Sequence, residues 1–376
     1  MQSYNLSAVT AMRRPRRFFL LIRARPRVTV LPLVPILILG VMFIGATASA
    51  KASRQSSGSE SHASTQATNP VPASANPALD NARSLLQDGH VDDAEHTLRD
   101  YLKEHPDSAE AHFLLGYTLF RKVQVDASKE VSIGDTAGQE AKSRDEYAKE
   151  SLAEFTEGAK YEVPGAFELK VVSLDYVLLK DYPDADKWLT KSLEKDPSDS
   201  DGWYYLGRTK YNENRFSEAI SAFQQYLKLV PKSVKGEDNL GLSYQGLGRT
   251  EDATAAYRTA IAWQERTLLQ DAGPFINLGA LLLDENHPQE AIPYLQRAVM
   301  ISTQETRAHE QLGKAYERLK QFPKAQSEFE KALQLAPQNS RLHYMLGHVY
   351  QEQGLKEKAK VEFDRSAALK KANPDR

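Results

Sequence analysis

The sequence predicts an all-α protein, an α-solenoid of about eight helix–turn–helix units. The first observation is a Leu-Gly pair that occurs five times, with successive glycines 34, 38, 34 and 34 residues apart. The second is an apolar series at helical spacing on both sides of each pair, interrupted by a polar break and closed by a proline. Fixed self-similarity at this period indicates one structural unit stacked along the chain. The five glycines are Gly207, Gly241, Gly279, Gly313 and Gly347.

The segment 200–233 shows one unit in full. Its first half carries Trp203, Leu206, Gly207 and Tyr211, and its second half carries Ala219, Phe223, Tyr226 and Pro231. Two antiparallel helices follow from this pattern, and we expect Gly207 to face Ala219 so that the helices approach closely. Turn residues recur between the two halves of each unit, at Asn214, Gly248, Asn286, Lys320 and Gly354.

The pattern resembles the tetratricopeptide repeat (TPR), which has a large residue, Leu-Gly and an aromatic residue on its first helix. Its second helix carries alanine, an aromatic residue, a further alanine and a proline, as the copy 306–339 does. The resemblance covers residues 75–373. It implies a solenoid whose first helices line a concave face that binds a protein or peptide.

Three earlier copies bring the predicted number of units to eight. Segment 166–199 fits the template with Ser173 in place of the glycine, and Gly116 opens a copy whose second helix is displaced by an insertion near 122–145. An insertion of this kind belongs to a loop or to extended helix ends. Segment 75–108 lacks the Leu-Gly pair, as a capping unit would. Near Trp263 the spacing lengthens by four residues, which predicts a longer second helix.

The first 74 residues follow other rules. Residues 1–50 form an arginine-rich leader with an uncharged apolar run at 28–46, typical of an export signal with its positive side in the cytoplasm. The run is long enough to span a bilayer as an anchor, whereas Ala48-Ser49-Ala50 is typical of signal-peptide cleavage near Ala50. Both alternatives place the repeats outside the cytoplasm, in a bacterial cell envelope. Residues 51–74 predict a disordered linker rich in Ser, Ala and Pro.

Composition excludes several functions. The chain has no cysteine, so disulfides, thiolate metal sites and covalent haem attachment are excluded. The formal net charge is −2, which offers no field for nucleic acid. We expect no cofactor and no nucleic-acid partner; the expected partners are a protein or peptide, and a membrane if the leader stays uncleaved.

No catalytic or metal-binding constellation stands out. His112, His309 and His343 take the place in their repeats that Trp203 takes in its own, which predicts packing. His343 and His348 are five residues apart, whereas two histidines that bind one metal from a helix need a spacing near four. The sequence therefore predicts no enzyme and no metal site.

The resemblance points to a peptide-binding groove on the first helices. Positions carried over from the family give an apolar and aromatic lining in the second to fourth units. The predicted groove residues are Phe113, Tyr117, Phe120, Phe167, Lys170, Leu174, Tyr204, Arg208 and Tyr211. The same positions in the last two units are mostly charged, among them Arg307, Glu310, Lys314, Arg341 and His348. Alternatively, the aromatic residues pack against the insertion through Val123, Val125, Val131 and Ile133.

Two functions remain open from the sequence. The first is a non-enzymatic scaffold or adaptor of the cell envelope that binds a peptide or amphipathic helix on its concave face. The alternative is an accessory assembly subunit of an envelope polysaccharide or secretion system.

Overall fold

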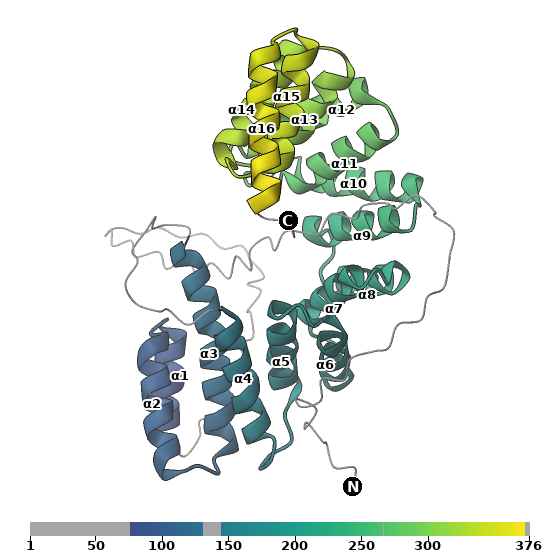
Figure 1. Ribbon diagram of the computed structural model, residues 1–376. Coiled ribbons are helices and arrows are strands. Elements are labelled where there is room, and N and C mark those ends of the chain that lie inside the picture. Colours follow the sequence, from purple (N-terminus) through teal and green to yellow (C-terminus); the bar gives the residue numbers. More distant parts are fainter. Residues whose placement is uncertain (1–75, 131–143, 266, 373–376) are drawn as a thin grey trace, which may run out of the picture. The chain divides into compact units, whose positions relative to one another are not determined.

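The computed structural model describes residues 76–130, 144–265 and 267–372, which form sixteen α-helices and no strand (Figure 1). The helices are arranged as eight antiparallel pairs, which confirms the predicted all-α repeat architecture. The leader 1–50, the linker 51–74 and most of the insertion lie outside the described residues. Among the described helices, none is both long and apolar enough to cross a bilayer.

Two compact units divide the chain, residues 1–188 and 189–376, and each is described by itself. The division falls inside α6 (Tyr182–Lys195). The N-terminal unit contains α1 (Pro77–Gln87), α2 (Val91–Glu104), α3 (Ala109–Glu130), α4 (Arg144–Gly158) and α5 (Ala166–Leu178). The C-terminal unit contains α7 (Ser200–Asn212), α8 (Phe216–Leu229), α9 (Val234–Gly246), α10 (Thr250–Gln264), α11 (Gly273–Asp284), α12 (Pro288–Ile301), α13 (Thr306–Arg318), α14 (Phe322–Leu335), α15 (Ser340–Glu352) and α16 (Lys356–Ala372).

The repeated glycine provides the close contact within each pair, but its partner differs from the expected one. A Cβ added to Gly207 would lie 2.7 Å from the ring of Phe223, so Phe223, not Ala219, packs directly on the glycine. Gly313 meets Phe329 in the same way at 2.6 Å. Each phenylalanine follows its glycine by 16 residues. Phe223 lies four residues after Ala219, on the same face of the helix, and its longer side chain reaches the glycine where the alanine methyl does not.

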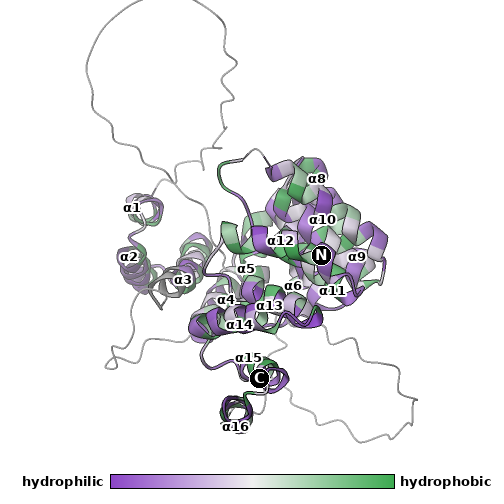
Figure 2. Ribbon diagram, turned by 90° about the horizontal axis from the view of Figure 1, so that it is seen from above, coloured by the Kyte–Doolittle hydropathy of each residue, from purple (hydrophilic) through white to green (hydrophobic). Residues whose placement is uncertain are grey.

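The five turn residues that the sequence predicted follow first helices in the structure. Asn214, Asn286 and Lys320 have φ of 60°, 62° and 57°, in the left-handed region, and Gly354 has φ of 77°. This conformation stops the helix and turns the chain back against it. Hydrophobic and hydrophilic residues share each helix, so each helix packs one stripe into the solenoid (Figure 2).

The four extra residues near Trp263 do not lengthen the second helix, and that prediction was wrong. Helix α10 ends at Gln264, and a loop leads to α11 at Gly273. The buried side chain of Gln264 holds this loop: its Nε2 donates to the carbonyl oxygen of Asp271 at 3.0 Å, and its Oε1 accepts from the Asp271 N–H at 2.6 Å. These two hydrogen bonds satisfy loop backbone groups that a continued helix would have paired internally.

First helices line the inner side of each unit. In the N-terminal unit α1 contacts α3 and α3 contacts α5; in the C-terminal unit α7, α9, α11 and α13 contact one another in turn. Second helices mainly contact the first helices on either side of them. Because the first helices are the more closely spaced set, their surface is the concave one.

A carboxyl group is buried inside the N-terminal unit. Asp175 on α5 is fully buried; its Oδ2 lies 2.6 Å from the Ser151 hydroxyl, which lies 2.8 Å from the Gly116 carbonyl oxygen. Asp175 Oδ1 has no hydrogen-bond partner among the described residues. Burial raises the pKa of Asp175 well above its ordinary value, and the Ser151 hydrogen bond opposes this only in part. The Ser151 hydroxyl has one proton and two acceptor neighbours. When Asp175 is protonated, its carboxyl group donates to Ser151 Oγ and the Ser151 hydroxyl donates to the Gly116 carbonyl oxygen, so both contacts are hydrogen bonds.

Candidate functional site: the inner face of the C-terminal unit

The inner face of the C-terminal unit begins with an aromatic cluster on α7. The ring of Tyr204 lies 5.3 Å from that of Tyr226 and 6.0 Å from that of Phe223, both on α8. The ammonium of Lys235, on α9, lies 4.6 Å from the centre of the Tyr204 ring. Tyr204 is half-buried: its ring packs against the two rings of α8 and also lies within cation–π distance of the Lys235 ammonium.

A hydrogen-bonded ladder crosses the next three first helices. Arg307 on α13 donates from Nη2 to Asn277 Oδ1 on α11 at 3.2 Å. Asn277 in turn donates from Nδ2 to both carboxylate oxygens of Asp238 on α9, at 2.9 and 3.0 Å. Asp238 and Asn277 are buried, whereas Arg307 is half-buried. The ladder fixes a guanidinium at the solvent-facing end of a buried polar chain.

Burial controls the ionisation of this ladder. It raises the pKa of Asp238 to about 7, against the hydrogen bonds from Asn277 and the charge of Arg307, with the charge of Asp271 adding to the rise. Burial also raises the pKa of Tyr211, on which Arg307, Arg208 and Asp238 act electrostatically. Arg307 therefore acts on both Asp238 and Tyr211, which lie on α9 and α7.

Charged pairs continue the inner face on α13 and α15. Lys314 Nζ lies 2.5 Å from Glu310 Oε1, and Arg341 on α15 approaches the same oxygen at 3.8 Å. Burial lowers the pKa of Lys314, although Glu310 opposes the change. His348 and Glu317 join α15 to α13 at 2.7 Å. This end is polar, as the sequence predicted, but its charges are largely paired with one another.

Three of the predicted groove residues lie on this face. Tyr204 belongs to the aromatic cluster, Arg208 is half-buried on the same helix, and Tyr211 packs edge-on against Phe216 at 5.3 Å. The sequence reasoning missed Lys235, Asp238 and Asn277. Asp238 lies three residues before Gly241, as Tyr204 lies three before Gly207, so the repeat spacing could have predicted Asp238 as an inner-face residue. Asn277 does not occupy that position in its repeat, and the spacing gave no reason to choose it.

The other six predicted residues lie in the N-terminal unit, where three of them serve packing. Phe113 stacks on Phe155 of α4 at 6.0 Å. Phe120 and Leu174 are buried, at 3% and 8% exposure. Side chains in this setting support the helices from within and have little surface to offer a ligand.

The remaining three are more open. Tyr117 meets the ring of Phe167 edge-on at 5.1 Å, and Phe167 is 48% exposed. Arg121 donates from Nη1 to the Tyr117 hydroxyl at 3.1 Å. Lys170 is half-buried on α5.

The alternative prediction, that the aromatic residues pack against the insertion, can be examined only for the described part of the insertion. Val123 is buried at 3% exposure because α3 continues as helix through Glu130. Val131, Ile133 and the side chain of Val125 lie outside what the structure describes. Within the described residues, the partner of Phe113 is α4.

The candidate histidines connect repeats. His309 places Nδ1 2.6 Å from Glu328 and Nε2 3.3 Å from the carbonyl oxygen of Thr303. Trp203, at the same place in its repeat, donates from Nε1 to the carbonyl oxygen of Pro197 at 2.9 Å. Both rings therefore tie a first helix to the turn before it. His112 and His343 make the matching pairs, with Glu154 and Pro106 and with Glu362 and Pro337.

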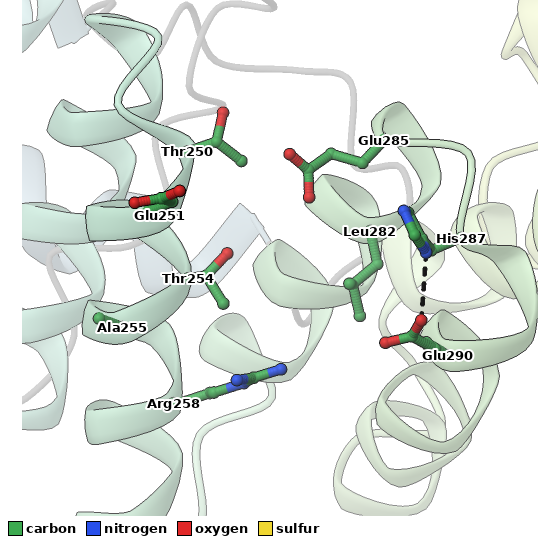
Figure 3. Close-up of a pocket in the computed structure, with 9 residues that line it drawn as sticks. All are labelled: Thr250, Glu251, Thr254, Ala255, Arg258, Leu282, Glu285, His287 and Glu290. Atoms are coloured by element: carbon green, nitrogen blue, oxygen red, sulfur yellow. Dashed lines mark hydrogen bonds and ion pairs between the residues drawn. The ribbon is translucent and has the colours of Figure 1, made fainter.

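A shallow pocket on α10–α12 offers no alternative site (Figure 3). Its ionisable side chains are exposed, and the contact between His287 Nδ1 and Glu290 Oε1, at 3.1 Å, joins residues one turn apart. Across the described ranges, no group of three metal-ligating side chains converges. The pocket is lined by Thr250, Glu251, Thr254, Ala255, Arg258, Leu282, Glu285, His287 and Glu290.

Sequence comparison identifies the repeat. Four models of the family described as tetratricopeptide repeat match residues 79–128, 200–233, 238–267, 306–339 and 328–361. The chain is a tetratricopeptide-repeat protein. The TPR array is typically a non-catalytic scaffold that mediates protein–protein interaction, and the matches lie in both units.

Named relatives match short segments of this TPR protein. The PEX5-related protein of Homo sapiens is 31% identical over 106 residues, 28% of this chain and 16% of that protein. A peroxisomal targeting signal receptor of Kluyveromyces lactis is 34% identical over 74 residues, 20% of this chain and 13% of that protein. The chain therefore spans less than a fifth of the length of these relatives.

A solved structure shares the fold. The crystal structure of the APC/C hetero-tetramer Cut9–Hcn1 contains a chain that aligns with 82% of this chain over 55% of its own length. The TM-score is 0.51 and the identity is 18%, so the likeness concerns the fold alone.

Proposed function

We propose that this TPR protein is a non-enzymatic adaptor that binds an extended peptide or an amphipathic helix of a partner protein on the inner face of its C-terminal unit. The observation that carries the proposal is the Arg307–Asn277–Asp238 ladder beside the Tyr204–Lys235 cluster. A half-buried aromatic ring supplies apolar contact area, and a guanidinium held in place by hydrogen bonds loses little freedom when it binds.

The relatives support a receptor role. One of them is named as a receptor for a peroxisomal targeting signal, although only part of it matches this chain. Recognition of a segment of another protein agrees with a concave surface formed by adjacent first helices.

The test is selection of peptides from a random display library on the immobilised full chain, followed by measurement of their affinities for variants. Tyr204→Ala and Arg307→Gln should each weaken binding by about tenfold or more, because each removes a central contact. Tyr161→Ala is the control: Tyr161 is 51% exposed and lies in the turn after α4, in the N-terminal unit. Unchanged affinity in both inner-face variants would exclude this surface.

We further propose that the adaptor works in the bacterial cell envelope. The support is the arginine-rich leader with its apolar run at 28–46. Fractionation of a bacterial host followed by sequencing of the mature N-terminus tests this. An intact N-terminus in the membrane fraction means a tethered adaptor, and a start near Lys51 in the soluble envelope fraction means a released one. A cytoplasmic chain with an intact leader would contradict the location.

A further inference from the structure

Within the described residues, a groove lies open between α15 and α16. We call it the terminal groove, and it is lined by Tyr344, Phe363, Ser366, Ala367 and Lys370. Tyr344 is 54% exposed, and its ring lies 5.5 Å from that of Phe363. The two rings give the groove an apolar floor, with the Lys370 ammonium 5.8 Å from the centre of the Tyr344 ring.

Earlier repeats show what normally covers this surface. Phe363 follows Gly347 by 16 residues, as Phe223 follows Gly207 and Phe329 follows Gly313. Phe223 and Phe329 are fully buried, and the first helix of the following repeat packs on each pair: α9 on α8 and α15 on α14. Phe363 makes the same contact with its glycine, at 2.8 Å, but is only partly buried. The terminal groove thus continues the stacking interface of the solenoid.

The third residue of a covering helix varies in size. It is Gly236 on α9, where an added Cβ would lie 2.6 Å from the ring of Tyr226. It is Ala308 on α13 and Leu342 on α15, both fully buried. What the covering helices share is an uncharged residue at this buried position, so the groove suits an amphipathic helix that turns an apolar face toward α15 and α16.

The charge of α16 determines which amphipathic helices the groove favours. Helix α16 carries six basic residues against three acidic ones, a net of +3. Two copies of this chain pairing groove to groove would bring two basic helices together, which is repulsive. The same charge attracts an acidic helix.

We propose that the terminal groove is a second docking site, which takes an acidic amphipathic helix of a partner protein as an added first helix of the solenoid. It lies on the last repeat and differs from the inner-face site in its residues. The helix packs its apolar side chains on Tyr344, Phe363 and Ala367, and its acidic side chains face α16.

The probe is a fluorescein-labelled, hydrocarbon-stapled peptide with the sequence of residues 234–246, the helix that covers α7–α8 in this protein. Stapling is needed because an isolated helix of this length is marginal in water. Fluorescence anisotropy with the full chain should show saturable binding in the micromolar range. A Lys235→Glu version of the peptide should bind more tightly at low salt, and the difference should shrink as salt is added.

Adjacent alanines on α16 provide the decisive pair of variants. Ala367→Glu puts a charge on the groove floor and should weaken binding about tenfold or more. Ala368→Glu is the matched control, because Ala368 is exposed on the same helix but does not line the groove, and it should bind as the wild type does. Both substituted residues are exposed, so both variants should fold.

Three results would overturn the proposal: no saturable binding to the wild-type chain, equal affinity for the two alanine variants, or loss of binding with Tyr204→Ala alone, which would place the peptide on the inner face. Analytical ultracentrifugation tests whether a second copy of the chain occupies the groove instead. Self-association of the wild type that Ala367→Glu abolishes would show that a second copy fills the groove, which contradicts a partner helix. None of these results decides whether library peptides bind the inner face, so the two proposals fail separately.

Discussion

The N-terminal and C-terminal units share one packing contact but bury their carboxyl groups in different ways. In the first unit a Cβ on Gly116 would lie 2.8 Å from the Phe155 ring, and in the second one on Gly313 would lie 2.6 Å from Phe329. Phe155 follows its glycine by 39 residues and Phe329 by 16, yet the ring reaches the same place. The insertion therefore leaves the contact between the paired helices intact.

The carboxyl groups differ in their partners. Asp175 in the first unit meets one hydroxyl inside the helix stack and leaves one oxygen without a partner among the described residues. Asp238 in the second unit receives two hydrogen bonds from Asn277, which links it to Arg307 on the inner face. The difference teaches that Asp175 is enclosed by the helix stack, whereas Asp238 is connected through Asn277 to a guanidinium on the inner face.

Removing the shared ring should have the largest effect. Phe155→Ala and Phe329→Ala should each lower the free energy of unfolding of their unit by about 3–5 kcal/mol, because each leaves a cavity at a fully packed contact. Phe363→Ala should cost clearly less, since its ring is partly exposed already. Urea denaturation followed by circular dichroism measures all three, and an equal loss in Phe329→Ala and Phe363→Ala would contradict the open terminal groove.

Asp175→Asn should raise the free energy of unfolding at pH 8 by about 1–3 kcal/mol, because it removes a buried carboxyl group whose ionisation burial opposes and whose Oδ1 has no hydrogen-bond partner among the described residues. The raised pKa of Asp175 means that its stabilising contribution is complete below pH 4 and is lost as pH rises through that pKa. The variant should therefore flatten the pH dependence of stability. Ser151→Ala is a useful control, since it removes both hydrogen bonds of the Ser151 hydroxyl and should not stabilise. A wild type more stable than Asp175→Asn at pH 8 would contradict the raised pKa of Asp175.

Asp238→Asn should change stability less, because Asn277 already partners both oxygens. With a pKa of about 7 in the folded state, Asp238 contributes stability that is complete below pH 4 and lost as pH rises to about 7. The wild-type stability curve should fall over that window and level off above it, and the variant should lack this fall. Thermal unfolding at unit steps of pH measures the curve; a parallel fall in the variant would assign the titration to another group.

Arg307→Gln should have the smallest effect on stability, below about 1 kcal/mol, because the side chain is half-buried. Its charge lowers the pKa of Asp238, so removing it should move the titration of Asp238 to higher pH. The same pH series detects the move. A midpoint that stays in place would show that Arg307 does not act on Asp238.

The sequence predicted the helical repeat well and the side chains of the inner face only in part. The period and the Leu-Gly pairs gave eight helix pairs and the turns at Asn214 and Gly354, because such signals are local to one repeat. Phe120 was predicted to line a groove and is buried, since whether a position on a first helix faces solvent depends on how neighbouring repeats stack. The loop after Gln264 was missed because a glutamine side chain that replaces backbone hydrogen bonds leaves no periodic trace.

By itself, the sequence determined the repeat, because helix periodicity, turn residues and the small residue at each crossing act within about 34 residues. Tertiary structure alone decided which ring packs on which glycine, which aspartate is sealed in and which reaches the surface, and that Phe363 stays partly open. Those outcomes depend on contacts between residues from different helices, and burial in such contacts determines both pKa and exposure.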